Sequence, residues 1–248
     1  HPVADLNLNP LNPVTNVRAL TDDPDRTIRL LGRQIAGLQD QGVAATIKHF
    51  PGDGVDSRDQ HLTTTCNSLT MEQWRRRHGR VFQELIRGGV AAIMPGHITL
   101  PAYQRERIQG FPPPATLSRE LLTDLLKTEM GFPGVVVSDA MTMGGFRGWY
   151  PNALEGEIQS FLAGVDILLW PSYAFMDEVE KRIQRGEIPM ERLDDAVARA
   201  WALKERLGLV AGGEALVRPL SPVERDHLTV TSQTVAEKAL TLVRDRKS

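Results

Sequence analysis

The chain has 248 residues, of which 41% are hydrophobic and 24% are charged, a composition typical of a globular protein with a substantial core. Its 29 basic and 31 acidic residues leave a formal net charge of -2, which does not favour nucleic acid or an anionic membrane as a partner. The single cysteine, Cys66, excludes an internal disulfide framework, and no apolar run reaches the roughly 18 residues that a membrane span requires.

Five apolar runs typical of buried strands alternate with amphipathic, helix-like segments. The predicted strands are residues 2–6, 43–50, 90–94, 134–137 and 165–170. The predicted helices include residues 27–39, residues 70–87 behind a capping box, a helix that Ser118 caps and Gly131 ends, and residues 190–207. Continuous apolar strands joined by helices form a parallel sheet that is covered on both faces, so the pattern predicts an α/β fold.

Polar side chains, glycine or proline follow each apolar run, and residues useful for chemistry follow nearly every one. No Gly-x-Gly-x-x-Gly turn follows the first strand, so a (β/α)8 TIM-type barrel is favoured over an open doubly wound sheet. A closed barrel needs eight strands, whereas about five are visible in this chain. We therefore expect residues 1–210 to form a partial TIM-barrel catalytic domain with about the last five βα units, the earlier units lying before His1.

The chain changes character after residue 210. Residues 211–222 are rich in glycine and proline and predict a linker, and residues 235–243 form another apolar segment. We expect residues 211–248 to form a linker and a C-terminal helical segment that leads toward a second domain outside the chain.

The densest group of chemically useful side chains runs from Lys48 to His61. Lys48 and His49 end the second predicted strand, where a lysine needs a partner or a ligand, although His49 could equally be a hydrogen-bonded core histidine. Asp59 and His61 are separated by one residue, so the carboxylate can hold the imidazole in one tautomer and raise its basicity. They form a candidate general acid/base, and two solvent-facing loop residues are the alternative.

Asp139 follows a run of three valines, residues 135–137, at the end of the fourth predicted strand. A carboxylate at the mouth of a barrel can attack an electrophilic centre or stabilise a developing cation, and a helix cap is the alternative. His97 after the third strand and Arg18 after the first are candidates for contact with a polar substrate. A structural histidine and a surface arginine are the alternatives for these two residues.

In these residues the chain resembles the family 3 glycoside hydrolases, in particular their β-N-acetylglucosaminidase (β-hexosaminidase) branch. The matching blocks are residues 1–7, 12–14 with Arg18, 48–52, 94–97, 134–143 and 163–166, and together they cover nearly the whole chain. The resemblance implies a retaining hydrolase that removes terminal β-linked N-acetylglucosamine through a covalent glycosyl-enzyme. A β-glucosidase of the same family and a catalytically silent carbohydrate-binding fragment are the alternatives.

The resemblance also implies a role for each candidate residue. Asp139 matches the nucleophile, and the loop with Asp59 and His61 resembles the mobile acid/base dyad of this branch, with His61 transferring the proton. Gln60 stands between them where the branch usually has serine. The expected substrate-binding residues are Lys48, His49, Arg18, His97 and Met141.

The expected partner is a carbohydrate, with no nucleic acid and no membrane, and a missing N-terminal segment of the same barrel is the one protein partner that the pattern suggests. We expect neither a metal nor an organic cofactor. Asp53, Asp56 and Asp59 share a loop, but they lack the spacing and the closing glutamate of an EF-hand. The natural glycoside, the choice between hydrolysis and phosphorolysis, the oligomeric state and the compartment (the bacterial cytoplasm, or the periplasm or outside of the cell) stay open.

Overall fold

Residues 1–210 and 219–240 are described by the computed structural model, and the chain divides into two units, His1–Leu207 and Gly208–Ser248. In the second unit, α7 (Pro222–Ala239) begins at a capping box formed by Ser221 and Glu224 and buries none of its residues. Most of the predicted linker and the end of the chain lie outside the described residues, so the predicted boundary at residue 210 stays a prediction. Among the described helices, none combines the length and the apolar character needed to cross a bilayer.

The first unit is built on a parallel sheet with the strand order β1-β3-β5-β6. The strands are β1 (Thr46–Phe50), β3 (Ala92–Pro95), β5 (Val135–Ala140) and β6 (Ile167–Leu169). Val3 forms a further parallel bridge to Lys48, so the predicted strand 2–6 is reduced to one bridge beside β1. The strand order follows the chain order without reversal, as in a (β/α)8 barrel and unlike a doubly wound sheet.

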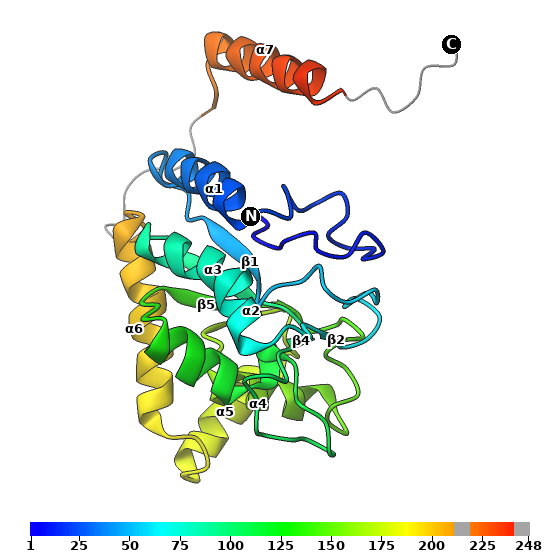
Figure 1. The fold of residues 1–248 in the computed structure, drawn as a ribbon. Helices are drawn as coiled ribbons and strands as arrows, with labels where there is room; N and C mark the ends of the chain where they lie inside the picture. The colour runs from blue at the N-terminus through cyan, green and yellow to red at the C-terminus, as the bar shows by residue number, and fades with distance from the viewer. Residues whose placement is uncertain (211–218, 241–248) are drawn as a thin grey trace. The chain divides into compact units, whose positions relative to one another are not determined.

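Helices connect these strands, and the loops that follow β1 and β5 extend to the right in Figure 1. A short second sheet pairs β2 (Thr65–Cys66) with β4 (Ile98–Thr99) among these loops. The helices of the first unit are α1 (Pro24–Gln39), α2 (Met71–Arg76), α3 (His78–Arg87), the 3-10 turn η1 (Ala115–Leu117), the π-helix η2 (Glu120–Glu129), α4 (Ala153–Ala163), α5 (Phe175–Gln184) and α6 (Met190–Arg206).

The single helix predicted over residues 70–87 is wrong at one point. Arg77 leaves the helical conformation, with φ -113° and ψ -101°, and separates α2 from α3. Two contacts account for the break. His78 turns into the core, where its Nε2 lies 2.9 Å from the backbone oxygen of Asp53. Gly79 lies against the ring of Trp74, and a Cβ at position 79 would come within 2.6 Å of that ring. Helices α4 and α5 and the second sheet were not predicted from the sequence.

The core lies between the sheet and its helices. Ile47, Ile93 and Val136 are fully buried on three adjacent strands and pack in one cluster with the apolar faces of the helices. Burial of each such side chain contributes about 1.5–3 kcal/mol. Phe50 packs edge-on against Phe82 with 5.2 Å between ring centroids, which fixes the carboxyl end of β1. The core thereby positions the strand end from which the candidate active-site loop departs.

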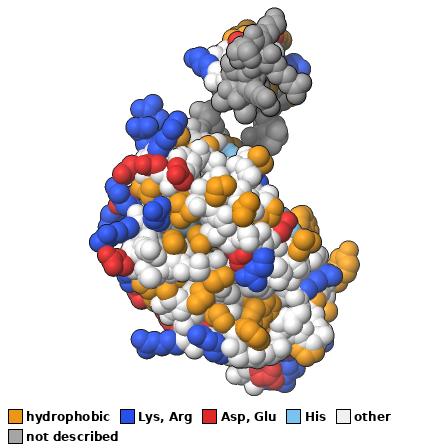
Figure 2. Space-filling view, turned by 45° about the vertical axis from the view of Figure 1, so that its right-hand side comes forward, with side chains coloured by type: hydrophobic (Ala, Val, Ile, Leu, Met, Phe, Trp, Pro, Cys, Tyr) orange, Lys and Arg blue, Asp and Glu red, His pale blue; other side chains and the backbone are white. Residues whose placement is uncertain are grey.

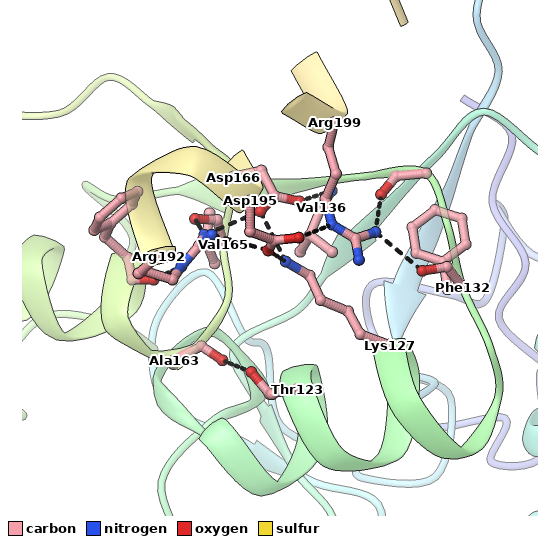
Figure 3. A network of polar contacts seen from close by, with 12 residues as sticks. Thr123, Lys127, Phe132, Val136, Ala163, Val165, Asp166, Arg192, Asp195 and Arg199 are labelled. Atoms are coloured by element: carbon pink, nitrogen blue, oxygen red, sulfur yellow. Dashed lines mark hydrogen bonds and ion pairs between the residues drawn. The ribbon is translucent and has the colours of Figure 1, made fainter. Parts of the chain in front are cut away.

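A network of ion pairs joins the start of β6 to η2 and α6 (Figure 3). The fully buried carboxylate of Asp166 accepts hydrogen bonds from Lys127 Nζ at 2.8 Å and from the backbone of Val136 at 2.9 Å. The charged residues of the network are Lys127, Asp166, Arg192, Asp195 and Arg199. They lie at the amino ends of the strands, so we assign them to stability.

We expect Asp166→Asn to lower the free energy of unfolding by roughly 3 kcal/mol or more, because it leaves Lys127 and Arg192 short of a buried counter-charge. Urea unfolding of the purified protein measures this change. The control is Glu72→Gln, which removes an exposed pair with Arg76 and should cost less than about 0.5 kcal/mol. If both variants lose the same small amount of unfolding free energy, the assignment of this network to stability is wrong.

Candidate functional site

Asp139 lies on β5 itself, because the strand continues three residues beyond the predicted run, as far as Ala140. Its side chain is 17% exposed, and its Oδ1 accepts a hydrogen bond from the backbone of Ala140 at 2.8 Å. The helix-cap alternative does not hold, since the next helix begins only at Ala153 behind Asn152. Asp139 is therefore a partly exposed carboxylate at the carboxyl end of a central strand.

His49 lies between Asp139 and a second, fully buried carboxylate, Asp5. Its Nδ1 is 2.7 Å from Asp5 Oδ2, and its Nε2 is 3.8 Å from Asp139 Oδ2. Burial acts to raise the pKa of Asp5, but the charge and the hydrogen bonds of His49 outweigh it and lower that pKa. Asp5 thus stays ionised and holds the ring so that Nε2 points toward Asp139.

Asp59 and His61 form a hydrogen-bonded pair at the surface of the loop after β1. His61 Nδ1 lies 2.6 Å from Asp59 Oδ1, which also accepts the backbone N–H of His61 at 2.8 Å. Burial acts to raise the pKa of Asp59, but these hydrogen bonds and the charges of His61 and Arg18 together outweigh it and lower that pKa. With Nδ1 bound to an ionised carboxylate, Nε2 of the half-exposed ring is the nitrogen left to exchange a proton.

Gln60 anchors the loop from the inside, while the side chains on either side of it point outward. It is fully buried, donates to Asp53 Oδ2 at 2.9 Å and accepts the backbone N–H of His97 at 3.0 Å. This explains why a longer side chain than serine stands between the two residues of the pair. The mobility that the resemblance implies for this loop stays a prediction.

Two glycines after Asp139 hold the same loop through backbone hydrogen bonds. Gly144 N donates to the backbone oxygen of His61 at 2.7 Å, and Gly145 N donates to that of Gln60 at 3.2 Å. A Cβ on Gly144 would overlap the backbone oxygen of Leu62, so the close approach requires glycine. The structure thereby brings the Asp59–His61 pair and the segment after Asp139 to one end of the barrel.

Asp53 and His78, for which the sequence analysis proposed no role, support this loop. Asp53 accepts hydrogen bonds from the side chains of Asn12 and Gln60, both at 2.9 Å, and from the backbone of Gly54. Burial and the nearby carboxylate of Asp5 raise the pKa of Asp53 to about 6. His78 is fully buried, and burial lowers its pKa, so a neutral ring donates to the backbone oxygen of Asp53.

His97 and Met141 lie beneath the site. His97 is fully buried, with Nδ1 2.9 Å from Thr116 Oγ1 and Nε2 3.1 Å from the backbone oxygen of Ala140. A carbonyl oxygen only accepts, so Nε2 carries the proton and Nδ1 accepts from Thr116. Met141 is 2% exposed and packs against Phe146. The structure therefore places both residues as supports of the backbone next to Asp139, rather than at the open side where a sugar could touch them.

Lys48 and Arg18 are the two predicted binding residues with accessible side chains. Lys48 is half-buried, and strand alternation places it on the face opposite to Ile47, which packs against the helices. Arg18 is exposed, and its charge acts on Asp59. Both cations can donate hydrogen bonds to a polar ligand at this end of the barrel. Among the described residues, no group of three or more His, Cys, Asp or Glu side chains is arranged to hold a metal ion.

A protein-family model matches the first unit except its last four residues, and relatives and solved structures match more of the chain. The family described as glycosyl hydrolase family 3 N terminal domain matches residues 1–203. A "Beta-N-acetylglucosaminidase/beta-glucosidase" from Cellulomonas fimi is 39% identical, over 98% of this chain and 44% of the relative. A "Beta-hexosaminidase A" from Pseudoalteromonas piscicida is 30% identical, over 83% of this chain and 37% of the relative. The chain thus spans less than half the length of these relatives.

Solved structures of related proteins match the chain over its entire length. A "Beta-glucoside phosphorylase BglX" superposes with a TM-score of 0.90 at 34% identity, and the match covers 46% of that protein. A family 3 β-N-acetylglucosaminidase from Paenibacillus sp. str. FPU-7 superposes with a TM-score of 0.88 at 34% identity, over 47% of its length. These matches confirm the barrel type of fold and the family resemblance that the sequence predicted.

The buried ring of His97 predicts a pH dependence of stability. Burial lowers the pKa of His97 from 6.5 to about 4, so its contribution to stability is present above pH 6.5 and is lost as the pH falls through 4. Wild-type protein should lose on the order of 3 kcal/mol more than His97→Gln over this interval, as measured by urea unfolding at several pH values.

His227→Gln, which changes an exposed histidine on α7, should follow the wild-type pH dependence. Asp53 and His78 also titrate in or near this interval, but they contribute to all three proteins and cancel in the comparison. If the free energy of unfolding changes with pH equally in wild type and His97→Gln, the ring of His97 is not held neutral by the fold.

Proposed function

Because the chain belongs to glycosyl hydrolase family 3, we propose that the protein carrying it is a glycosidase that releases terminal β-linked N-acetylglucosamine. One observation carries the proposal: the 2.7 Å hydrogen bond from Gly144 N to the backbone oxygen of His61. It joins the loop of the Asp59–His61 pair to the segment that follows Asp139, so a carboxylate and an imidazole can act on one sugar. Relatives that match the chain at 30–39% identity are named as β-N-acetylglucosaminidases or β-hexosaminidases.

In the proposed reaction, Asp139 attacks the anomeric carbon while His61 donates a proton to the departing oxygen. The bond to the leaving group breaks as the bond to the Asp139 carboxylate forms, giving a covalent glycosyl-enzyme. His61, now neutral, then takes a proton from water, which attacks the same carbon and restores Asp139. Two displacements give net retention of configuration. Asp59 stabilises the protonated ring, as its short contact with Nδ1 allows.

The remaining residues prepare this chemistry without exchanging protons themselves. His49, held by Asp5, places a ring nitrogen 3.8 Å from Asp139 and orients the nucleophile. Lys48 and Arg18 are the proposed contacts to sugar hydroxyls. His97 and Met141 act as positioning residues, because both are buried behind the strand end.

Phosphorolysis is a second candidate reaction, and a specific observation favours it. The proposed acid/base is an imidazole, which repels an incoming anion less than a second carboxylate would. A relative named as a β-glucoside phosphorylase superposes on the whole chain at 34% identity. A glucoside is likewise the alternative substrate, since the Cellulomonas fimi relative is named for both glycosides.

Substitutions should separate the two catalytic roles. Asp139→Asn should lower kcat about a thousandfold or more with every aryl glycoside, because no covalent intermediate can form. His61→Ala should lower kcat/KM by about 10²–10⁴ for a phenyl glycoside but far less for a dinitrophenyl glycoside, whose leaving group needs no proton. Steady-state assays with both substrates measure this difference, and an equal loss with the two would remove His61 as the acid.

Assays with matched substrates and acceptors should identify the reaction. We expect the aryl N-acetylglucosaminide to be cleaved faster than the aryl glucoside, with N-acetylglucosamine as the product detected by chromatography. If phosphate acts as the acceptor, added phosphate raises the rate and yields the sugar 1-phosphate instead. Faster cleavage of the glucoside would exclude the proposed N-acetylglucosamine specificity, and an unchanged rate with phosphate would exclude phosphorolysis.

A further inference from the structure

The acid/base loop, residues 56–64, is attached to the interior of the protein through one side chain. Of these nine residues, Gln60 alone is buried. Figure 2, in which the right-hand side of Figure 1 comes forward, shows acidic and basic side chains at the surface of the molecule. Gln60 and its partner Asp53 differ from these, because 0% and 2% of their surface is exposed. The loop therefore depends on a carboxylate that water does not reach.

Other contacts fix the two ends of the acid/base loop. At its start, the backbone oxygen of Asp56 accepts a hydrogen bond from Asn12 Nδ2 at 2.7 Å. At its end, Trp149 Nε1 donates to Thr64 Oγ1 at 2.8 Å. Between these ends, the loop is held by two glycine amides that bind its backbone and by the side chain of Gln60. Loss of the Gln60 contacts would therefore free the middle of the loop while both ends stay in place.

The amide of Gln60 has one favourable orientation while Asp53 is ionised. Its Nε2 donates to Asp53 Oδ2 at 2.9 Å, and its Oε1 accepts the backbone N–H of His97 at 3.0 Å. A carboxylate only accepts and a backbone N–H only donates, so a flipped amide would match neither neighbour. The bond to the carboxylate is charge-assisted, which makes it roughly twice as strong as a bond between neutral groups.

A proton on Asp53 would go to the oxygen that faces Gln60. Oδ1 of Asp53 accepts two hydrogen bonds, from Gly54 N at 2.7 Å and from Asn12 Nδ2 at 2.9 Å, whereas Oδ2 accepts only the bond from Gln60. Protonation removes the charge that strengthens this bond. It also places a hydroxyl beside Nε2 of Gln60, which has no lone pair to accept the proton. Protonation of Asp53 therefore weakens the attachment of the loop.

The charged groups around Asp53 favour uptake of this proton. The three donors to its carboxylate are neutral, and the ionised Asp5 accepts its backbone N–H at 2.8 Å. His49 acts in the opposite direction, and His78, on α3, is neutral and binds only the backbone oxygen of Asp53. Burial and the charge of Asp5 raise the pKa of Asp53 to about 6. Asp53 is therefore ionised at pH 7 and takes up a proton as the pH falls through about 6.

We propose that Asp53 is a positioning residue whose ionised carboxylate holds Gln60, and with it the Asp59–His61 pair, and that uptake of a proton by Asp53 releases the middle of the acid/base loop. The assignment rests on the proposed glycosidase function and adds to it a control of the acid/base by pH. Asp53 acts through Gln60 and exchanges no proton with the substrate.

The pH dependence of cleavage tests this control. The quantity measured is kcat/KM for the phenyl N-acetylglucosaminide divided by kcat/KM for the dinitrophenyl one, because only the first needs a proton from His61. Loss of charge on Asp139 lowers both values and cancels in the ratio. From pH 7 to pH 5, the wild-type ratio should fall about tenfold relative to the ratio of Asp53→Asn, whose residue 53 does not titrate.

Gln60→Ala provides a second comparison that leaves the buried Asp53 unchanged. It cuts the link to the loop, so its ratio at pH 7 should lie about tenfold below that of wild type and should not fall through pH 6. Gln184→Ala is the matched control, since Gln184 is exposed on α5, and it should follow wild type. If Gln60→Ala shows the same fall as wild type, Asp53 does not act through Gln60 and the proposal is overturned.

Hydrogen exchange tests the release of the loop without a substrate. After correction for the intrinsic rates, the amides of residues 57–63 in wild type should exchange about tenfold faster at pH 5 than at pH 7, whereas those of β1 should not. Equal protection of residues 57–63 at the two pH values would overturn the proposal. If wild-type protein cleaves no aryl N-acetylglucosaminide, the proposed function fails, while the exchange rates still decide whether Asp53 holds the loop.

Discussion

The carboxylate of Asp5 is the constraint on which the candidate site depends. It is fully buried, and a buried carboxylate without partners would cost several kcal/mol, so its oxygens must be hydrogen-bonded. Its three partners are the ring and the backbone of His49 and the backbone of Asp53. The first two fix the ring beside Asp139, and the third fixes the start of the loop that carries the acid/base pair. A fully buried group thus sets the geometry of two groups that we propose to act on the substrate.

The two ends of the barrel use charge differently. At the amino ends of the strands, Lys127 and Asp166 are paired within the protein, and their pairing leaves little capacity for a ligand. At the carboxyl ends, Asp139, His61 and Lys48 keep part of their surface and part of their hydrogen-bonding capacity open. This division matches the general separation of stability and catalysis in barrels of this type. It also explains why buried charges alone do not locate an active site.

Local features of the site were predictable from the sequence, and contacts between distant segments were not. Asp59 and His61 are two residues apart, so their pairing could be proposed from spacing, and Asp139 was marked by the valines before it. Asp5 binds residues 44 and 48 positions away, and no spacing rule reveals such a contact. A signal was present nonetheless, since an aspartate inside an apolar strand needs a buried partner. The break at Arg77 had no such signal, because it follows from how neighbouring side chains pack.

The hydrogen bond between Trp149 and Thr64 ties the segment that follows Asp139 to the loop that carries His61. A substitution at Trp149 removes the donor to the Thr64 hydroxyl and so disturbs the residues that follow His61. A second change, at or near Thr64, would be needed to restore the loop. In a lineage of related chains, these two positions should therefore change together rather than one at a time.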